Sequence, residues 1–155
     1  MEEPTKVCIY ARVSTSQQDF THQLTSLRAY AKEHHYQVVK EYTEKISGAK
    51  KVAEREALKE LLEDVEQNQV KKILVFECSR LSRRALDFLS IIEKLNEKGV
   101  SVFILQNGLE TLLPDGKVNP IASLVLGIMS QFNSMERDLI RARMKNGYDN
   151  LRAQH

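Results

Sequence analysis

The chain has 155 residues, of which 42% are hydrophobic and 28% charged, and its formal net charge is +2. This length and apolar content predict one globular domain with a substantial core, and they exclude a disordered or low-complexity chain. No segment is long and apolar enough for a membrane span, and acidic Glu2 and Glu3 occupy the place where a signal peptide needs basic residues. We therefore expect a cytoplasmic protein without membrane contact.

The two cysteines, Cys8 and Cys78, each lie in an apolar run typical of a strand. Buried thiols are typical of a reducing compartment, and two of them cannot complete a four-ligand zinc site. The four histidines also match no metal-ligand spacing. We expect no metal and no cofactor.

Strands and helices are predicted to alternate along the first two thirds of the chain. Apolar runs rich in β-branched residues predict strands at 7–13, 37–42, 72–76 and 100–105. Apolar residues at helical spacing predict helices around 24–31, 57–65 and 86–95, the last stopped by Gly99. Such alternation is typical of parallel βαβ units. The expected fold is a three-layer α/β domain with a mostly parallel sheet of four or five strands, the fifth within the turn-rich segment 107–120, and helices on both faces.

The last part of the chain has a different pattern. Beyond Pro120 no proline interrupts it, and apolar residues step by four and three, at Ile121, Val125, Ile128, Phe132, Met135 and Leu139. This heptad pattern predicts that a body of residues 1–118 is followed by a long helix, 119–155. The helix is expected to project and to pair with a second copy through residues 121–139. The alternative is a final helix packed back over the sheet.

Arginine and serine are concentrated where the predicted strands end. Ligands of open parallel sheets bind beyond the carboxyl ends of the strands, so segments 12–18, 46–48 and 78–84 are expected to meet there. Arg12, Arg80 and Arg83 would together grip a phosphodiester, because the guanidinium fork matches phosphate oxygens. Each element has a simpler alternative. The serines at 14 and 16 suit a helix N-terminus, and the arginines at 80 and 83 suit a solvated helix face or pairing with nearby carboxylates.

Other phosphate chemistries lack their usual residues. The six glycines form neither a P-loop nor G-x-G-x-x-G, and the strand ends lack the grouped carboxylates of a two-metal nuclease. What remains is metal-free phosphoryl transfer, with arginines for charge and a serine for attack.

At these residues the chain resembles the catalytic domain of the serine recombinases, the resolvase and invertase family of DNA recombinases. The most specific match is Tyr-Ala-Arg-Val-Ser-Thr at residues 10–15, followed by Gln-Gln. Further matches, which extend the resemblance over nearly the whole chain, are Ser47-Gly48, Arg55 on the second helix, Arg80-Leu81-Ser82-Arg83, and Met135-Glu136-Arg137.

The resemblance implies a site-specific recombinase that cuts and rejoins double-stranded DNA without metal or ATP. Ser14 would attack the phosphodiester and hold the 5′ phosphate. Arg12, Arg80 and Arg83 would bind the scissile phosphate. Residues implied to complete the pocket are Gln23, Ser47, Arg55 and Arg137, and those implied to contact the DNA backbone are Arg141, Arg143 and Lys145. The resemblance also implies a homodimer that forms a tetramer in the active synaptic complex.

The sequence departs from the family's pattern in three places. Ser79 stands where the family often has Asp, so it cannot orient Arg80 by charge, and the proton-transfer group stays open. Ala142 and Met144 replace a common Glu and Thr. No DNA-binding region follows His155, so a catalytic-domain fragment or a truncated relative is expected. Two alternatives therefore stand, a catalytically silent recombinase-like DNA-binding or regulatory module and a flavodoxin-like protein that binds a phosphate ligand.

Overall fold

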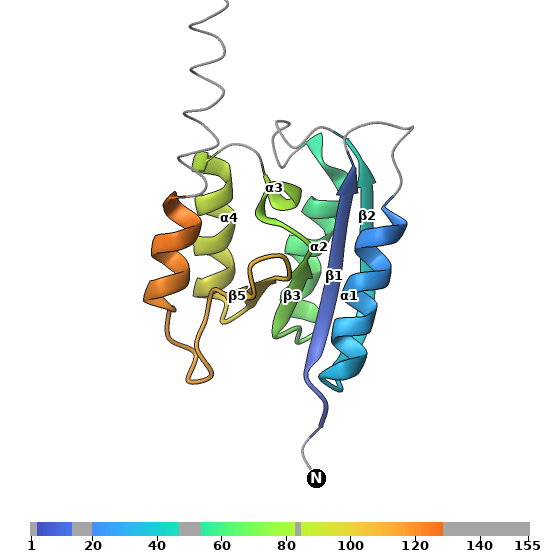
Figure 1. The fold of residues 1–155 in the computed structure, drawn as a ribbon, viewed down its shortest axis with the longest axis horizontal. Helices are drawn as coiled ribbons and strands as arrows, with labels where there is room; N and C mark the ends of the chain where they lie inside the picture. The colour runs from blue at the N-terminus through green and yellow to red at the C-terminus, as the bar shows by residue number, and fades with distance from the viewer. Residues whose placement is uncertain (1–2, 14–19, 47–53, 83–84, 129–155) are drawn as a thin grey trace, which may run out of the picture.

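A computed structural model of the chain describes residues 3–13, 20–46, 54–82 and 85–128. Its elements alternate in chain order (Figure 1): β1 (Lys6–Val13), α1 (Thr21–Glu33), β2 (Gln37–Lys45), α2 (Glu56–Gln67), β3 (Lys72–Val75), α3 (Cys78–Leu81), α4 (Ala85–Glu97), β4 (Ser101–Ile104) and β5 (Leu109–Glu110). The strands form one sheet in the order β2-β1-β3-β4-β5, in which only β5 runs antiparallel to its neighbour. The expected mostly parallel α/β sheet is confirmed, including the short fifth strand.

β1 is the central strand, and its sequence shows why. Every residue of β1 after Lys6 is buried, as expected for a parallel strand covered on both faces. Side chains alternate along a strand, so Ile9 packs toward α1 while Cys8 and Tyr10 belong to the cluster on the opposite face. The same alternation directs Arg12 to the side of Tyr10.

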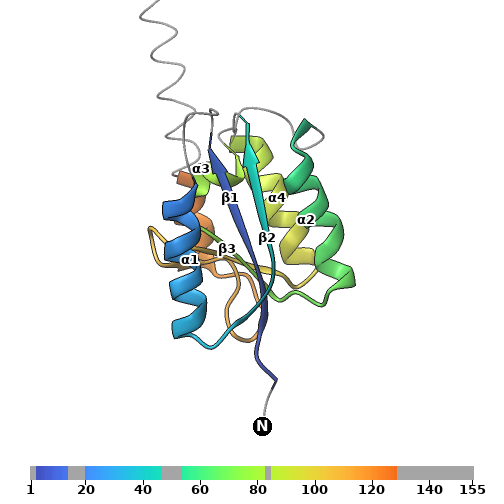
Figure 2. The same ribbon diagram turned by 90° about the vertical axis from the view of Figure 1, so that its right-hand side faces the viewer.

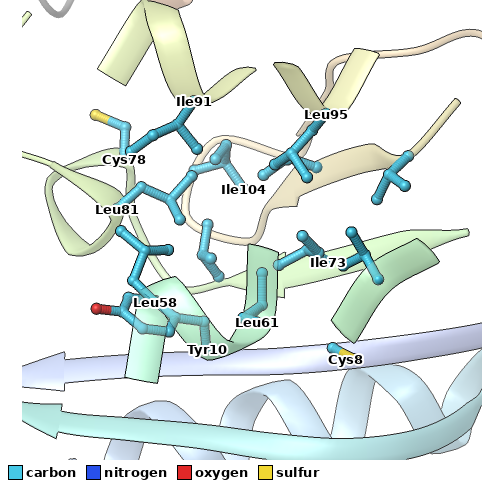
Figure 3. Packing of buried hydrophobic residues seen from close by; sticks show 14 of the residues in the cluster. Cys8, Tyr10, Leu58, Leu61, Ile73, Cys78, Leu81, Ile91, Leu95 and Ile104 are labelled. Atoms are coloured by element: carbon cyan, nitrogen blue, oxygen red, sulfur yellow. The ribbon is translucent and has the colours of Figure 1, made fainter. Parts of the chain in front are cut away.

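The two faces of the sheet carry different layers. Figure 2 shows α1 on one side of β1 and β2, with α2 and α4 on the other. The larger hydrophobic cluster lies on the side of α2 and α4 and includes Leu58 and Leu61 of α2 and Leu95 of α4 (Figure 3). A smaller cluster on the side of α1 includes Leu27 and Phe103. The three-layer arrangement is therefore confirmed.

The helices α1, α2 and α4 each end at a left-handed residue before the chain returns to the sheet. These residues are His35 (φ 58°), Gln69 (φ 55°) and Gly99 (φ 72°). Gly99 confirms the predicted helix stop, since glycine adopts this conformation without a Cβ clash. The other two stops use side chains for which a positive φ is uncommon, so the sequence pattern did not signal them.

Two expectations about the third strand region were wrong. β3 ends at Val75, and Cys78 begins the short helix α3 instead of lying in a strand. Cys78 is nevertheless buried, as is Cys8, and both are free thiols. Burial raises the pKa of the Cys8 thiol to about 11, so this group stays protonated at neutral pH.

A helix begins at residue 120, at the start predicted for the long final helix. Asn119 caps it, because its Oδ1 accepts the N–H groups of Ile121 (3.1 Å) and Ala122 (3.4 Å). Ala122 and Leu126 are buried against the main cluster. The helix is described to residue 128, and the remainder of the predicted projecting helix, 129–155, lies outside the described residues.

Candidate functional site

The site predicted from the sequence lies where β1, β2 and β3 end. The strand order makes these three strands neighbours, and all three run parallel, so their carboxyl ends meet at one edge of the sheet. The short helix α3 follows β3 at this edge (Figure 1).

Arg12 connects the ends of the strands to α3. The side chain is fully buried, and its guanidinium donates to three backbone carbonyls: from Nε to Arg80 (3.1 Å), from Nη1 to Ile46 (2.8 Å) and from Nη2 to Ser79 (2.7 Å). Gln23 of α1 fixes the backbone of Arg12, accepting its N–H at 3.3 Å and donating to its carbonyl at 2.9 Å. Arg12 therefore holds the end of β2 and the turn of α3 in fixed positions.

Arg55 binds the same turn from the other side. It is also fully buried, and it donates from Nη1 to the carbonyl of Leu81 and from Nη2 to the carbonyl of Arg80 (2.8 Å). Nη2 also donates to the hydroxyl of Tyr10 (2.5 Å), whose ring lies 5.5 Å from the guanidinium carbon. The carbonyl of Arg80 is therefore shared by two guanidinium groups, those of Arg55 and Arg12.

Glu44 closes this network at the end of β2. Its buried carboxylate accepts the hydroxyl of Tyr10 (2.5 Å) and lies 3.7 Å from Nε of Arg55. It also accepts the N–H groups of Ala57 (2.9 Å) and Leu58 (3.3 Å), so a side chain from β2 caps the N-terminus of α2. Free N–H groups at a helix start favour a negative charge. Burial raises the pKa of the Tyr10 hydroxyl, which therefore stays protonated as the donor to Glu44.

Arg80 is the more accessible arginine of the described cluster. Its side chain is 22% exposed, and Nη1 donates to the carbonyl of Arg12 (2.9 Å). Nε lies 3.1 Å from Oε1 of Glu77, and the hydroxyl of Ser79 donates to that same oxygen (2.8 Å). The sequence left open the alternative that Arg80 pairs with a nearby carboxylate instead of joining a site. The structure shows both, because Arg80 pairs with Glu77 at the edge where the arginines converge.

The structure thus brings together the predicted site residues that it describes, which are Arg12, Gln23, Arg55 and Arg80. Arg55 precedes α2 as its N-cap residue instead of lying within the helix. Predicted site residues outside the described part of the chain are Ser14, Ser47, Arg83, Arg137, Arg141, Arg143 and Lys145. Sequence reasoning missed Glu44, although its position two residues after buried Tyr42 on β2 places it on the same face.

Among residues 3–13, 20–46, 54–82 and 85–128, no cluster of three or more His, Cys, Asp or Glu side chains is placed to hold a metal ion. In the same ranges no helix has the length and apolar character needed to cross a membrane.

The network makes a prediction about stability. Replacing Tyr10 by Phe removes one acceptor of buried Arg55 and one donor to Glu44, and an unsatisfied buried polar group costs about 1–3 kcal/mol. We expect Tyr10→Phe and Glu44→Gln each to lower the free energy of unfolding by about that amount, as measured by urea denaturation. Their combined effect should fall short of the sum by at least about 0.5 kcal/mol, because they share partners.

Glu41→Gln is the matched control. Glu41 lies on β2, as Glu44 does, and the substitution breaks a more exposed ion pair between Glu41 and Arg28 of α1. Its cost should stay below about 1 kcal/mol. Strict additivity of the Tyr10 and Glu44 substitutions would show that the two side chains do not act as one network.

Comparisons with known proteins agree with this geometry. Residues 7–155 match the family model described as Resolvase, N terminal domain. The chain is 34% identical over 144 residues to a resolvase of Clostridium perfringens, covering 93% of this chain and 70% of that protein. It is 30% identical over 140 residues to the transposon Tn1546 resolvase of Enterococcus faecium, covering 90% of this chain and 66% of that protein.

Solved structures give the same result. The N-terminal catalytic domain of TP901-1 integrase matches with a TM-score of 0.68 and 32% identity, over 87% of this chain and 98% of that one. A resolvase family site-specific recombinase from Streptococcus pneumoniae matches with a TM-score of 0.64 and 27% identity, over 97% of this chain and 99% of that one. The chain therefore belongs to the resolvase family and carries the N-terminal catalytic domain of a serine-type site-specific DNA recombinase.

Proposed function

We propose that this chain cuts and rejoins DNA with Ser14 as the nucleophile and with Arg80, Arg83 and Arg12 as ligands of the scissile phosphate. The observation that carries the proposal is the convergence of Arg12, Arg55 and Arg80 at the carboxyl ends of β1, β2 and β3. Ser14 is the next residue after the last one of β1. The proposed nucleophile therefore directly follows β1, the strand that carries Arg12 to the edge where the arginines converge.

The reaction balances without an energy source. The Ser14 oxygen forms a bond to phosphorus, the bond from phosphorus to the 3′ oxygen breaks, and the proton lost by the serine hydroxyl ends on that 3′ oxygen. The protein then holds the 5′ phosphate as a serine ester, so one phosphate ester replaces another. Attack by a 3′ hydroxyl reverses the step and rejoins a strand. Guanidinium groups stabilise the charge on the phosphate in the transition state.

The buried arginines and the exposed one have different parts in this proposal. Arg80 is partly exposed, so a phosphate can reach it directly. Arg12 is fully buried against carbonyls, and a phosphate reaches it only when one of those bonds is exchanged. Gln23 and Arg55 support the site by holding Arg12 and the α3 turn. Ser47 and Arg137 are proposed to complete the pocket, and the basic residues Arg141, Arg143 and Lys145 to contact the DNA backbone.

Trapping the covalent intermediate tests the nucleophile. We expect Ser14→Ala to abolish the protein–DNA adduct, because the attacking oxygen is lost, while the thermal midpoint of unfolding stays within a few degrees of the wild type. Ser16→Ala is the matched control and should keep the adduct. The measurement is denaturing electrophoresis of the protein incubated with its cognate site labelled at one strand end.

An adduct that persists in Ser14→Ala would move the nucleophile to Ser16 or Ser47. A wild-type protein that binds the site without forming an adduct would favour the second candidate, a catalytically silent module that binds or regulates. That candidate is supported by the complete burial of the Arg12 and Arg55 guanidinium groups on backbone carbonyls.

We further propose that DNA is cut by a tetramer built from dimers that form through residues 121–139. The described start of this helix supports a second copy as partner. Ile121 (68%), Leu124 (63%) and Ile128 (60%) are exposed, whereas Ala122 and Leu126 are buried. The residues of the heptad pattern at 121 and 128 therefore lie away from the helix's own domain. A DNA substrate and two buried free thiols support a cytoplasmic location.

Two aspartate substitutions two residues apart separate dimerisation from folding. Ile128→Asp places a charge on the exposed face and should give a folded protein. The dissociation constant of its dimer should be at least about tenfold higher than that of the wild type. Leu126→Asp places a charge in the core and should unfold the domain. Sedimentation over a concentration series, together with circular dichroism, checks both. Unfolding by Ile128→Asp, or an unchanged dimer, would argue against this face as the interface.

A further inference from the structure

A carboxylate contacts Arg80 although the residue next to it, Ser79, carries none. Oε1 of Glu77 lies 3.1 Å from Nε of Arg80 and accepts the hydroxyl of Ser79 at 2.8 Å. The Glu77 and Arg80 side chains are 27% and 22% exposed, so the pair lies at the mouth of the site instead of in open solvent.

The backbone of α3 explains why these side chains meet. Glu77 is the extended N-cap residue of α3 (φ −149°, ψ 161°), and its carbonyl accepts the N–H of Arg80 at 3.1 Å. This turn places residues 77 and 80 on the same side, as at any helical spacing of three. The carbonyl of Arg80 is at the same time held by Arg12 and Arg55, so its backbone cannot shift to release the contact.

Two contacts define the direction of the Arg80 guanidinium. Oε1 of Glu77 lies 3.1 Å from Nε as an ion pair without hydrogen-bond geometry, and the carbonyl of Arg12 accepts from Nη1 at 2.9 Å. Nη2 is the nitrogen that neither contact uses. A guanidinium held at two corners presents one fixed edge to a ligand, whereas a long side chain held only at Nη1 can rotate about its other bonds.

We propose that Glu77 is the positioning residue for Arg80 and supplies the carboxylate that Ser79 lacks. Glu77 acts through Arg80 and does not itself touch the phosphate, which its negative charge would repel. Ser79 serves as a second anchor, because its hydroxyl donates to the same carboxylate oxygen. This inference rests on the proposed function of Arg80 as a phosphate ligand.

The first test compares cleavage in variants that move the carboxylate by two residues. Glu77→Gln should lower the rate of adduct formation on the cognate DNA about tenfold, because a positioning contact is lost while the guanidinium remains. Arg80→Ala should lower it more, by the roughly 10² to 10³ typical of a lost preorganised donor. Adding Ser79→Asp to Glu77→Gln returns a carboxylate beside Arg80 and should restore most of the rate. Adding the neutral isostere, Ser79→Asn, should not.

The second test does not depend on cleavage. The order parameter of the Arg80 Nε–H bond is measured by NMR relaxation in the same variants, because an ion pair that positions the guanidinium restricts its motion. It should be about 0.85 in the wild type, below about 0.6 in Glu77→Gln, high again with Ser79→Asp, and low with Ser79→Asn. Thermal unfolding of each variant controls for loss of the fold.

The outcomes separate this inference from the function on which it rests. An Arg80 side chain that is equally ordered with and without the Glu77 carboxylate would overturn the positioning role, even if Arg80→Ala abolishes cleavage. So would a Glu77→Gln variant that cleaves at the wild-type rate, or one for which Ser79→Asp and Ser79→Asn are equivalent. If the wild type forms no adduct, the proposed function fails, and the order parameter of Arg80 still decides whether Glu77 positions it.

Discussion

The structure of the site depends on one constraint, which is that a buried guanidinium must find hydrogen-bond acceptors. Arg12 and Arg55 are both fully buried, and the acceptors come mainly from the short helix α3. A helix of four residues leaves most of its carbonyls without partners inside the helix. Those of residues 79, 80 and 81 are satisfied by the two arginines. The same bonds therefore serve the carbonyls of the helix and most donors of the two arginines, and α3 takes its position from them. Nε of Arg55 has no hydrogen-bond acceptor and is paired only electrostatically, with Glu44 at 3.7 Å.

This arrangement also explains how a cluster of positive charges is tolerated. The carboxylate of Glu44 lies between Tyr10, Arg55 and the start of α2, on the inner side of the site. Glu77 lies against Nε of Arg80. Burying a charge is costly unless it is paired or hydrogen-bonded, and these contacts meet that condition. In the proposed reaction the phosphate would meet Arg80 already held in place, whereas it would reach Arg12 only by exchange of a carbonyl bond.

Much of the fold could be predicted from the sequence, because the signals were local. The apolar run of β1 predicted a strand covered on both faces, and Gly99 predicted the end of α4. The stops at His35 and Gln69 could not be predicted, because neither residue is a glycine, although local bonds from Tyr36 N–H to the Ala31 carbonyl and from Val70 N–H to the Val65 carbonyl close both helix ends. α3 was missed for a different reason. Four residues carry too little periodicity to show a helix, and the bonds that hold α3 come from Arg12 and Arg55, far away in sequence.

The candidate site was predicted in outline but not in detail. The strand-end rule brought Arg12 and Arg80 to one edge, yet no pattern showed that Arg12 is buried on carbonyls while Arg80 is partly exposed. Pairing of Arg80 with Glu77 was one of the alternatives that the sequence left open, and the turn of α3 decides it. Whether a residue supports a site or meets its ligand is decided by packing, which spacing along the chain does not report.

Amide hydrogen exchange of α3 tests most directly whether buried arginines hold it in place. The informative amides are those of Arg80 and Ser82, which donate to the carbonyls of Glu77 and Cys78. Arg55→Met removes the guanidinium but keeps an apolar chain of similar length. In this variant we expect the two amides to exchange at least about tenfold faster, while Ile9 of β1 and Leu74 of β3 keep their protection. Unchanged protection of Arg80 and Ser82 in a variant that remains folded would contradict the account.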